Sequence, residues 1–220
     1  MNARLRSAFI CVLLSAPGPA ADHYLLISKA EFAEVQRKAE TLEWARAIRD
    51  DLIARAGRAL SRPLDFPTRG GQWPHWYSCP RDGVRLKTLT STRHQCPKCG
   101  EIYSGDPYDA VVLYGVHMQL SRDARDLALA YRFTGKTEYR DHAAAILDGY
   151  AARYASYPIH AKRPEETRGG ARVMAQTLDE SVWLIPLAFA YGLTRDDLPP
   201  DLRERVERNL FLPAAEVLRA

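Results

Sequence analysis

The chain has 220 residues, of which 46% are hydrophobic and 26% are charged, and this balance excludes disordered and collagen-like proteins. Its length fits one domain or slightly more. The net charge of +4 arises from 31 basic residues interspersed with 27 acidic ones. A charge distribution of this kind gives no support to nucleic acid as a partner.

The N-terminus has the pattern of a secretory signal. Arg4 and Arg6 precede an apolar run at residues 8–14, and small residues follow up to Ala20. The apolar run is far shorter than the ~20 residues that cross a bilayer. We therefore expect a signal peptide over residues 1–20, no membrane span, and a periplasmic or secreted location.

The first helices of the mature chain, residues 21–220, carry clear boundary signals. Ser28 and Glu31 have the spacing of a capping box, which predicts a helix from there to about residue 39. A second helix is predicted over residues 41–60 and ends before Pro63. Its apolar stripe is Leu42, Ala45, Ile48, Leu52 and Ala56.

Residues 61–108 have a different composition. This segment is rich in Gly, Pro, Trp, Tyr and Cys and shows no helical period. An unstructured loop of this length is unusual in a compact domain, and a bound metal ion supplies order that hydrophobic burial cannot. We expect a metal-binding insertion here.

A repeated pentapeptide lies within this insertion. The sequence CPRDG at residues 79–83 returns as CPKCG at residues 96–100. Each copy places two ligands three positions apart around a tight turn that Pro stiffens and Gly relieves. The two turns together predict one structural zinc site. Its ligands are Cys79, Asp82, Cys96 and Cys99.

Other uses of these residues remain open from the sequence. A disulfide from Cys79 to one of the other two cysteines is the main alternative, although it would leave an odd thiol in the mature chain. His94 is a second choice to Asp82 as fourth ligand, and His75 is a weaker one. Catalytic zinc is disfavoured, because four protein ligands leave no open position for water.

After residue 109, the apolar residues again recur with the spacing typical of helices. Gly135 is placed to end the first of these as a C-terminal cap, and Ser121 marks an interruption within it. Short connections between helices favour antiparallel neighbours, so we expect side-by-side helical hairpins. The predicted helices cover residues 110–133, 137–154, 173–191 and 200–218.

Aromatic and polar residues suggest a ligand-binding face. The rings of Trp73 and Tyr77 have flat apolar faces that suit sugar rings, although they also suit the core of the insertion. Gln176 and Glu180 share one face of an otherwise apolar helix, where they either meet a ligand or cap the helix. Arg172 precedes them and adds positive charge for an acidic sugar.

Five segments of the chain carry a family resemblance when they are taken in order. They are residues 70–77, 93–96, 103–109, 127–135 and 176–180. Together they resemble the N-terminal helical domain of the heparinase II/III-like polysaccharide lyases, a superfamily that also contains oligoalginate lyases. The resemblance covers roughly residues 24–219. It implies an all-α fold in the form of a partial α/α toroid of helical hairpins, here with an inserted zinc-knuckle loop.

The resemblance also implies a function. Such lyases cleave uronic-acid polysaccharides by β-elimination, using an Asn/His pair, a Tyr and a second His. Those catalytic positions fall after the helix that closes this sequence, so no catalytic residue is assigned. We expect a fragment that lacks the C-terminal half of the ring and the β-sandwich, and that self-associates through its incomplete ring.

Two other functional classes are considered. A non-catalytic carbohydrate-binding or scaffolding module with a structural zinc site is the main alternative. A zinc-ribbon adaptor for nucleic acid or protein is disfavoured by the predicted signal peptide and the balanced charge.

Overall fold

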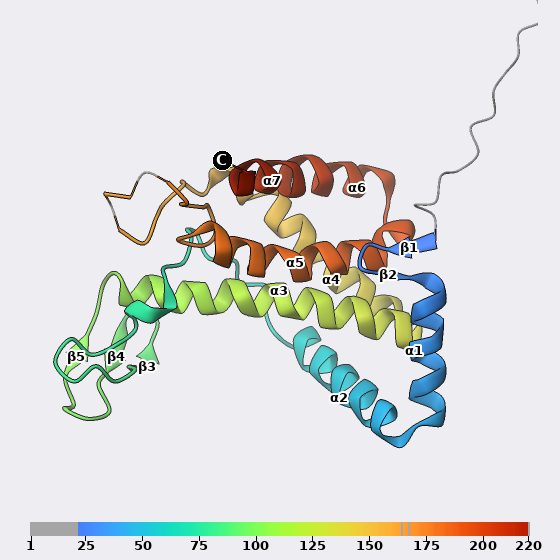
Figure 1. The fold of residues 1–220 in the computed structure, drawn as a ribbon, viewed down its shortest axis with the longest axis horizontal. Helices are drawn as coiled ribbons and strands as arrows, with labels where there is room; N and C mark the ends of the chain where they lie inside the picture. The colour runs from blue at the N-terminus through green and yellow to red at the C-terminus, as the bar shows by residue number, and fades with distance from the viewer. Residues whose placement is uncertain (1–21, 164, 167, 220) are drawn as a thin grey trace, which may run out of the picture.

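A computed structural model describes residues 22–163, 165–166 and 168–219, so the predicted signal peptide lies outside the described residues. The fold is mostly helical (Figure 1). Its helices are α1 (Lys29–Thr41), α2 (Glu43–Leu60), α3 (Tyr108–Thr134), α4 (Thr137–Ala151), α5 (Thr177–Thr194), α6 (Pro200–Val206) and α7 (Leu212–Arg219). A π-helical turn, Glu207–Phe211, joins the last two.

The long helix α3 runs through the middle of the molecule and packs against α2, α4 and α5 (Figure 1). Helix α1 packs on α2, α6 packs on α4, and α7 packs on α5. Each helix from α1 to α4 therefore packs against the next one in the chain, as predicted, whereas α6 packs on α4 instead of α5. The core between them includes the fully buried side chains of Leu127, Ile146, Tyr150, Tyr154 and Trp183.

Two predicted helix boundaries are confirmed in atomic detail. The Ser28 hydroxyl accepts a hydrogen bond from the Glu31 amide at 3.1 Å, and the Glu31 carboxylate accepts from the Ser28 amide at 2.8 Å. Gly135 ends α3 with φ of 71° and donates its amide to Tyr131 O at 2.7 Å. Glycine reaches this left-handed conformation at little cost.

The expected interruption at Ser121 is wrong, because α3 continues through it. The Ser121 hydroxyl is buried and donates to the carbonyl of Trp183 at 2.6 Å. The serine therefore joins α3 to α5 through a hydrogen bond and does not break its own helix.

Small sheets qualify the expectation of an all-α fold. Strands β1 (His23–Tyr24) and β2 (Ile27–Ser28) form a hairpin before α1. A second antiparallel sheet has the order β3-β4-β5 and lies in the predicted insertion. Its strands are β3 (Lys87–Thr90), β4 (Arg93–Gln95) and β5 (Ile102–Tyr103). We call residues 74–107, which contain this sheet, the knuckle segment.

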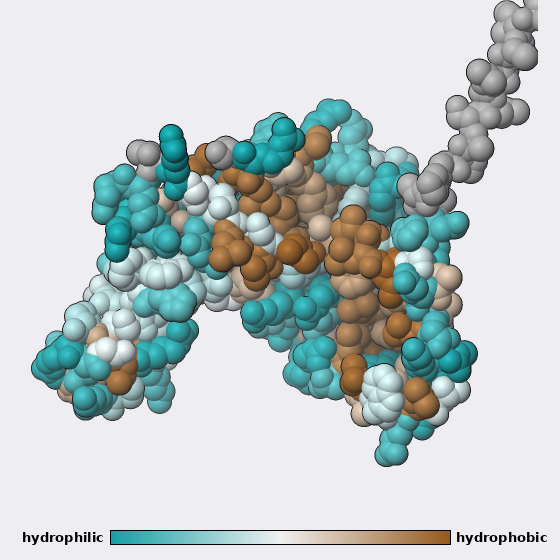
Figure 2. Space-filling view, in the orientation of Figure 1, coloured by the Kyte–Doolittle hydropathy of each residue, from teal (hydrophilic) through white to brown (hydrophobic). Residues whose placement is uncertain are grey.

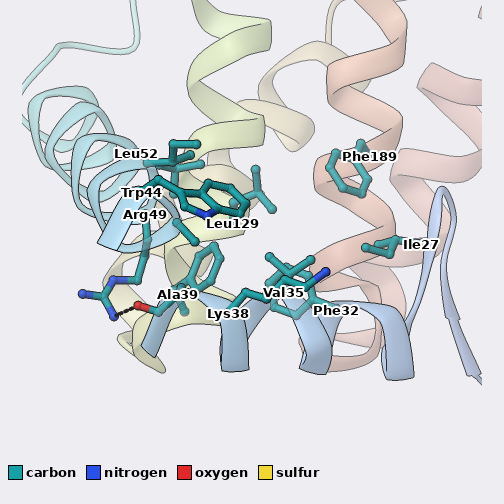
Figure 3. Close-up of a pocket in the computed structure, with 13 residues that line it drawn as sticks. Ile27, Phe32, Val35, Lys38, Ala39, Trp44, Arg49, Leu52, Leu129 and Phe189 are labelled. Carbon is teal, nitrogen blue, oxygen red and sulfur yellow. Dashed lines mark hydrogen bonds between the residues drawn. The ribbon is translucent and has the colours of Figure 1, made fainter. Parts of the chain in front are cut away.

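An apolar groove of about 410 Å³ opens between α1 and α2 at the end of the molecule away from the knuckle segment (Figure 3). Trp44 and Ile48 line it and are 61% and 62% exposed. Because Ile48 belongs to the predicted apolar stripe of α2, only part of that stripe reaches the core. Figure 2 shows that hydrophobic surface continues from this region over α5. Within the described part of the chain, no helix has the length and hydrophobicity to cross a membrane.

Candidate metal centre and adjacent cleft

The repeated pentapeptides fold into two turns with the same backbone pattern. In the first, Gly83 donates its amide to Cys79 O at 2.8 Å, and the Cys79 amide donates to Val84 O at 2.8 Å. The second turn, residues 96–101, repeats both bonds at 3.0 and 2.9 Å. Gly83 and Gly100 have φ of 68° and 78°, so each turn ends in the left-handed conformation that favours glycine. The sequence repeat is thus also a structural repeat.

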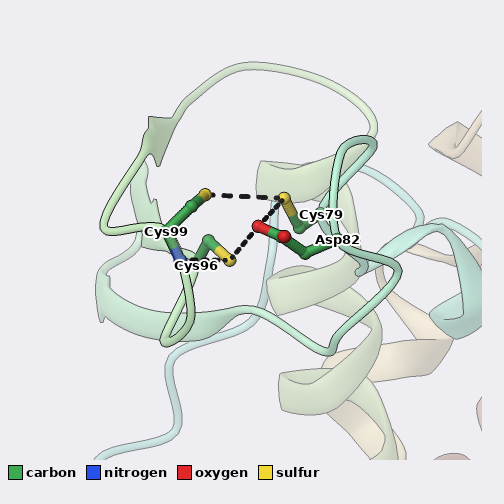
Figure 4. A group of neighbouring side chains, drawn as sticks. All are labelled: Cys79, Asp82, Cys96 and Cys99. Atoms are coloured by element: carbon green, nitrogen blue, oxygen red, sulfur yellow. Dashed lines mark hydrogen bonds between the residues drawn. The ribbon is translucent and has the colours of Figure 1, made fainter.

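The four predicted ligands come together between these turns (Figure 4). One donor atom from each of Cys79, Asp82, Cys96 and Cys99 lies within 4.8 Å of all the others. The carboxylate oxygen of Asp82 is 3.6 Å from the Cys79 sulfur and 3.5 Å from the Cys96 sulfur. The sulfur atoms of Cys79 and Cys99 are 3.9 Å apart.

These separations agree with the edges of a coordination tetrahedron. Metal–sulfur bonds of about 2.3 Å and a metal–oxygen bond of about 2.0 Å give sulfur–sulfur edges of about 3.8 Å and sulfur–oxygen edges of about 3.5 Å. Cys79 and Cys96 are buried, and Asp82 and Cys99 are half-buried. The group could therefore hold a metal ion.

The disulfide alternative is not what the structure shows. All three described cysteines are free thiols. The separation of 3.9 Å between the Cys79 and Cys99 sulfur atoms is well above the ~2.05 Å of an S–S bond.

The alternative histidine ligands lie outside the group. His94 is fully buried, with Nδ1 at 2.7 Å from the Tyr77 hydroxyl and Nε2 at 2.8 Å from the Asp109 carboxylate. Both ring nitrogens are thus engaged, and His94 anchors the knuckle segment to the first turn of α3. His75 is exposed, and its ring lies 4.6 Å from that of Trp73.

The four predicted ligands form a site with negative charge. Burial alone would raise the pKa of Cys79, but hydrogen bonding from the Tyr103 hydroxyl at 3.2 Å and from nearby backbone amides lowers it overall. The Asp82 carboxylate raises the pKa of Cys99 to about 11. Lys98 lies 3.5 Å from that carboxylate and offsets part of the negative charge. A metal cation that binds here must displace the Cys99 proton.

The chain just before the knuckle segment is held in place by buried polar side chains. Burial lowers the pKa of His117 to about 4, so its neutral ring donates through Nε2 to Arg69 O at 3.0 Å. The Tyr157 hydroxyl donates to Pro67 O at 2.6 Å. Gly71 packs so closely on Tyr114 that an added Cβ would lie 2.4 Å from its backbone. These contacts fix the backbone of residues 67–71.

A polar cleft of about 470 Å³ lies between this fixed backbone and residues 158–161, Arg163 and Glu166. Arg69 and Asp106 face each other on one wall and form a two-pronged ion pair with distances of 2.6 and 2.7 Å. On the other wall, His160 donates a ring hydrogen through Nε2 to Gly71 O at 2.8 Å. The cleft therefore combines fixed walls with charged side chains.

Two cations beside the cleft lie over indole rings. The Lys162 ammonium is 5.1 Å from the ring centre of Trp73, and the Arg163 guanidinium is 5.9 Å from that of Trp76. The two indoles meet edge to face at 5.4 Å. No sequence pattern pointed to either cation, because the contacts join segments about 90 residues apart in the chain.

Of the three predicted substrate-binding residues in this region, only Trp73 lies beside the cleft and is partly exposed. Trp73 is half-buried beside the cleft. Tyr77 is only 4% exposed, and its hydroxyl contacts Thr88 and His94, so its ring belongs to the core of the knuckle segment. Arg172 directs its guanidinium inward and donates to backbone carbonyls, including Tyr157 O at 2.6 Å.

The predicted pair Gln176 and Glu180, at the start of α5, also differs in burial. Glu180 is fully buried and accepts hydrogen bonds from the Met174 amide at 2.7 Å, the Val173 amide at 3.1 Å and the Tyr154 hydroxyl at 2.8 Å. Burial raises its pKa to about 7. Helix α5 starts at Thr177 and not at residue 173 as predicted, because Gln176 has an extended backbone, with φ of −157° and ψ of 152°. Gln176 is half-buried, and its side-chain amide donates to Asp179 at 2.8 Å.

The comparisons with known proteins relate the chain to polysaccharide lyases. It is 31% identical over 102 residues to an exo-oligoalginate lyase of Saccharophagus degradans and 35% identical over 105 residues to an alginate lyase of Stenotrophomonas maltophilia. Each alignment covers 46% of this chain but only 14% of the relative. Both relatives are thus alginate lyases of much greater length. No family model matches the chain.

Proposed function

We propose that this chain is the helical, sugar-binding part of a lyase that cleaves uronic-acid polysaccharide by β-elimination. The observation that carries the proposal is the similarity to two alginate lyases at 31% and 35% identity. The charged cleft beside the knuckle segment is a suitable place for an acidic chain. We further propose that the helical hairpins belong to an α/α toroid of the heparinase II/III-like kind, in a protein that is secreted or periplasmic.

The reaction sets clear chemical requirements. A base must remove the weakly acidic proton next to the uronate carboxylate, and the charge of that carboxylate must be neutralised as the 4-linked oxygen leaves. Cations at the cleft suit the second task. The nearby histidines are poor bases for the first, because His117 is buried and His160 donates to Gly71 O. We therefore assign binding to the described residues and leave proton transfer unassigned.

We propose Zn²⁺ as the ion of the metal centre, held by Cys79, Asp82, Cys96 and Cys99. Three thiolates and one carboxylate are a donor set that Zn²⁺ accepts, and four protein ligands are typical of structural rather than catalytic sites. When bound, the ion supplies cross-linking of the two turns. Trp76 packs against the small core around these ligands. A bound ion would therefore also stabilise the position of Trp76 at the edge of the cleft.

The test is incubation of the protein with alginate, with another uronate polymer and with a neutral polysaccharide. We expect binding of the acidic polymers only. Appearance of the ultraviolet absorbance of unsaturated uronate would show that the chain itself catalyses the elimination. Failure to bind any acidic polymer would contradict the proposal.

The second candidate is a non-catalytic carbohydrate-binding or scaffolding module. It is favoured by the engagement of His117 and His160 with backbone carbonyls, which leaves neither of them poised to take a proton. Binding of acidic polysaccharide without any unsaturated product would select this candidate over the lyase.

A further inference from the structure

We propose that Lys162 and Arg163 form an anion subsite that binds carboxylates of a uronate chain at the edge of the cleft. Arg163 lines the cleft directly. Lys162 is its neighbour in the chain, and its ammonium lies over the ring of Trp73 beside the cleft. The inference rests on the proposed function, because it assigns two residues to the acidic sugar that this function requires.

The first argument is that the two cations are already ordered. Each lies over an indole ring, at 5.1 Å for Lys162 on Trp73 and 5.9 Å for Arg163 on Trp76. A cation–indole contact restricts a long side chain without using its hydrogen-bond donors. Binding of an anion then loses less side-chain entropy than it would at a freely moving lysine or arginine.

The second argument concerns charge. Asp106 lines the cleft but is taken by its two hydrogen bonds from Arg69. Glu166 is the other carboxylate of the cleft wall. Among the described residues, no carboxylate lies within ion-pair distance of Lys162 or Arg163. Their donors are therefore available to an incoming carboxylate, and such charge-assisted hydrogen bonds are the stronger kind.

The third argument is that the backbone carrying the cations is fixed. His160 and Ala171 exchange backbone hydrogen bonds of 2.9 and 3.0 Å, and the Gln72 side chain donates to Ala161 O at 3.3 Å. Gly70 packs against the same stretch so tightly that an added Cβ would lie 2.3 Å from the His160 ring. Residues 162 and 163 therefore leave a well-anchored segment and present their side chains in a set direction.

The test is the affinity of the purified protein for an alginate tetrasaccharide, measured by calorimetry. We expect the double variant Lys162→Gln/Arg163→Gln to bind at least ~10-fold more weakly, because it loses charge-assisted hydrogen bonds. The matched control Lys136→Gln/Arg37→Gln removes the same charge near the C-terminal end of α3 and should bind as the wild type does. Lys136 follows that end of α3, and Arg37 lies on α1, where the neighbouring Gln36 donates to Arg132 O. If the sugar is cleaved, the same comparison is made on KM.

Two further ligands identify what the subsite recognises. A neutral cello-oligosaccharide of equal length should bind to neither protein, and poly-glutamate should bind more weakly than the tetrasaccharide. Equal binding of poly-glutamate would overturn the assignment to a sugar. Unchanged affinity of the double variant would overturn the subsite while leaving the proposed function intact. A wild-type protein that binds no tetrasaccharide would remove the proposed function itself.

Discussion

The helical bundle and the knuckle segment are ordered by different means. In the bundle, large apolar side chains such as Leu127, Trp183 and Leu187 are buried together in one continuous core. Most apolar side chains packed on the core of the knuckle segment are only partly buried, and its buried hydrophobic residues are Tyr77, Cys79, Leu86 and Cys96, joined by Val111 from α3. Two of these are predicted metal ligands. A segment with so little apolar surface to bury needs another source of stability, and metal coordination provides one.

The largest effect should follow from removal of one thiolate. We expect Cys96→Ser to abolish metal binding and to unfold the knuckle segment, since structural zinc contributes on the order of 10 kcal/mol to small domains. The bundle should keep its helical circular dichroism. Limited proteolysis will then cut between residues 79 and 100 while the helices resist.

The control for this experiment is Asp82→Cys, which completes a four-cysteine site and should retain the metal. Unfolding of the bundle in Cys96→Ser would contradict the claim that the two regions are stabilised separately. Protection of the knuckle segment from proteolysis without metal would contradict the claim that a metal orders it.

The next effect concerns the bundle alone. Glu180→Ala leaves the amides of Val173 and Met174 and the hydroxyl of Tyr154 without their acceptor. Each buried group left unpaired costs ~1–3 kcal/mol, so we expect the free energy of unfolding to fall by about 4 kcal/mol. Denaturant titration measures this loss. Glu180→Gln should lose less, and an unchanged metal content in both would confirm that the two regions are independent.

A pH effect of about 3 kcal/mol should come from the same carboxyl group. Burial raises the pKa of Glu180 from its ordinary value of 4.5 to about 7, so the folded protein favours the protonated form. This contribution to stability is complete below pH 4.5 and is lost as the pH rises through 7. The difference in unfolding free energy between wild type and Glu180→Gln should therefore change with pH in this window. A flat difference would show that Glu180 titrates normally.

The smallest effect on stability is expected in the apolar groove. Trp44 is 61% exposed, so Trp44→Ser should alter the free energy of unfolding by less than ~0.5 kcal/mol. The same change removes exposed apolar surface from a groove that lies apart from the last helices, where the sequence predicts self-association. Sedimentation at several concentrations measures whether the groove contributes to association. Self-association that is unaffected by this variant would place the contact elsewhere.

Local signals in the sequence predicted the local structure well. The capping box of Ser28 and Glu31, the stop at Gly135 and the twin turns of the metal centre all depend on residues close together in the chain. Such features follow from backbone geometry and short-range hydrogen bonds, which a sequence pattern records directly.

Contacts between distant segments could not be predicted in this way. The sequence suggested that Arg172 binds substrate, but its guanidinium donates a hydrogen bond to the Tyr157 carbonyl. The sequence also suggested that Glu180 faces a substrate groove, but the segment before α5 covers it and the Met174 amide donates to its carboxylate. The positions of Lys162 and Arg163 depend on indoles about 90 residues away. Each of these outcomes is decided by tertiary packing, which the spacing of residues along one segment does not contain.

The central claim is that Cys79, Asp82, Cys96 and Cys99 hold a single zinc ion that orders the knuckle segment. Native mass spectrometry of the purified protein, compared with the denatured mass, tests it most directly. We expect the native protein to carry the mass of one zinc ion and the denatured chain to have all of its cysteines reduced. A metal-free native protein whose mass is two hydrogens short, as a disulfide requires, would contradict it.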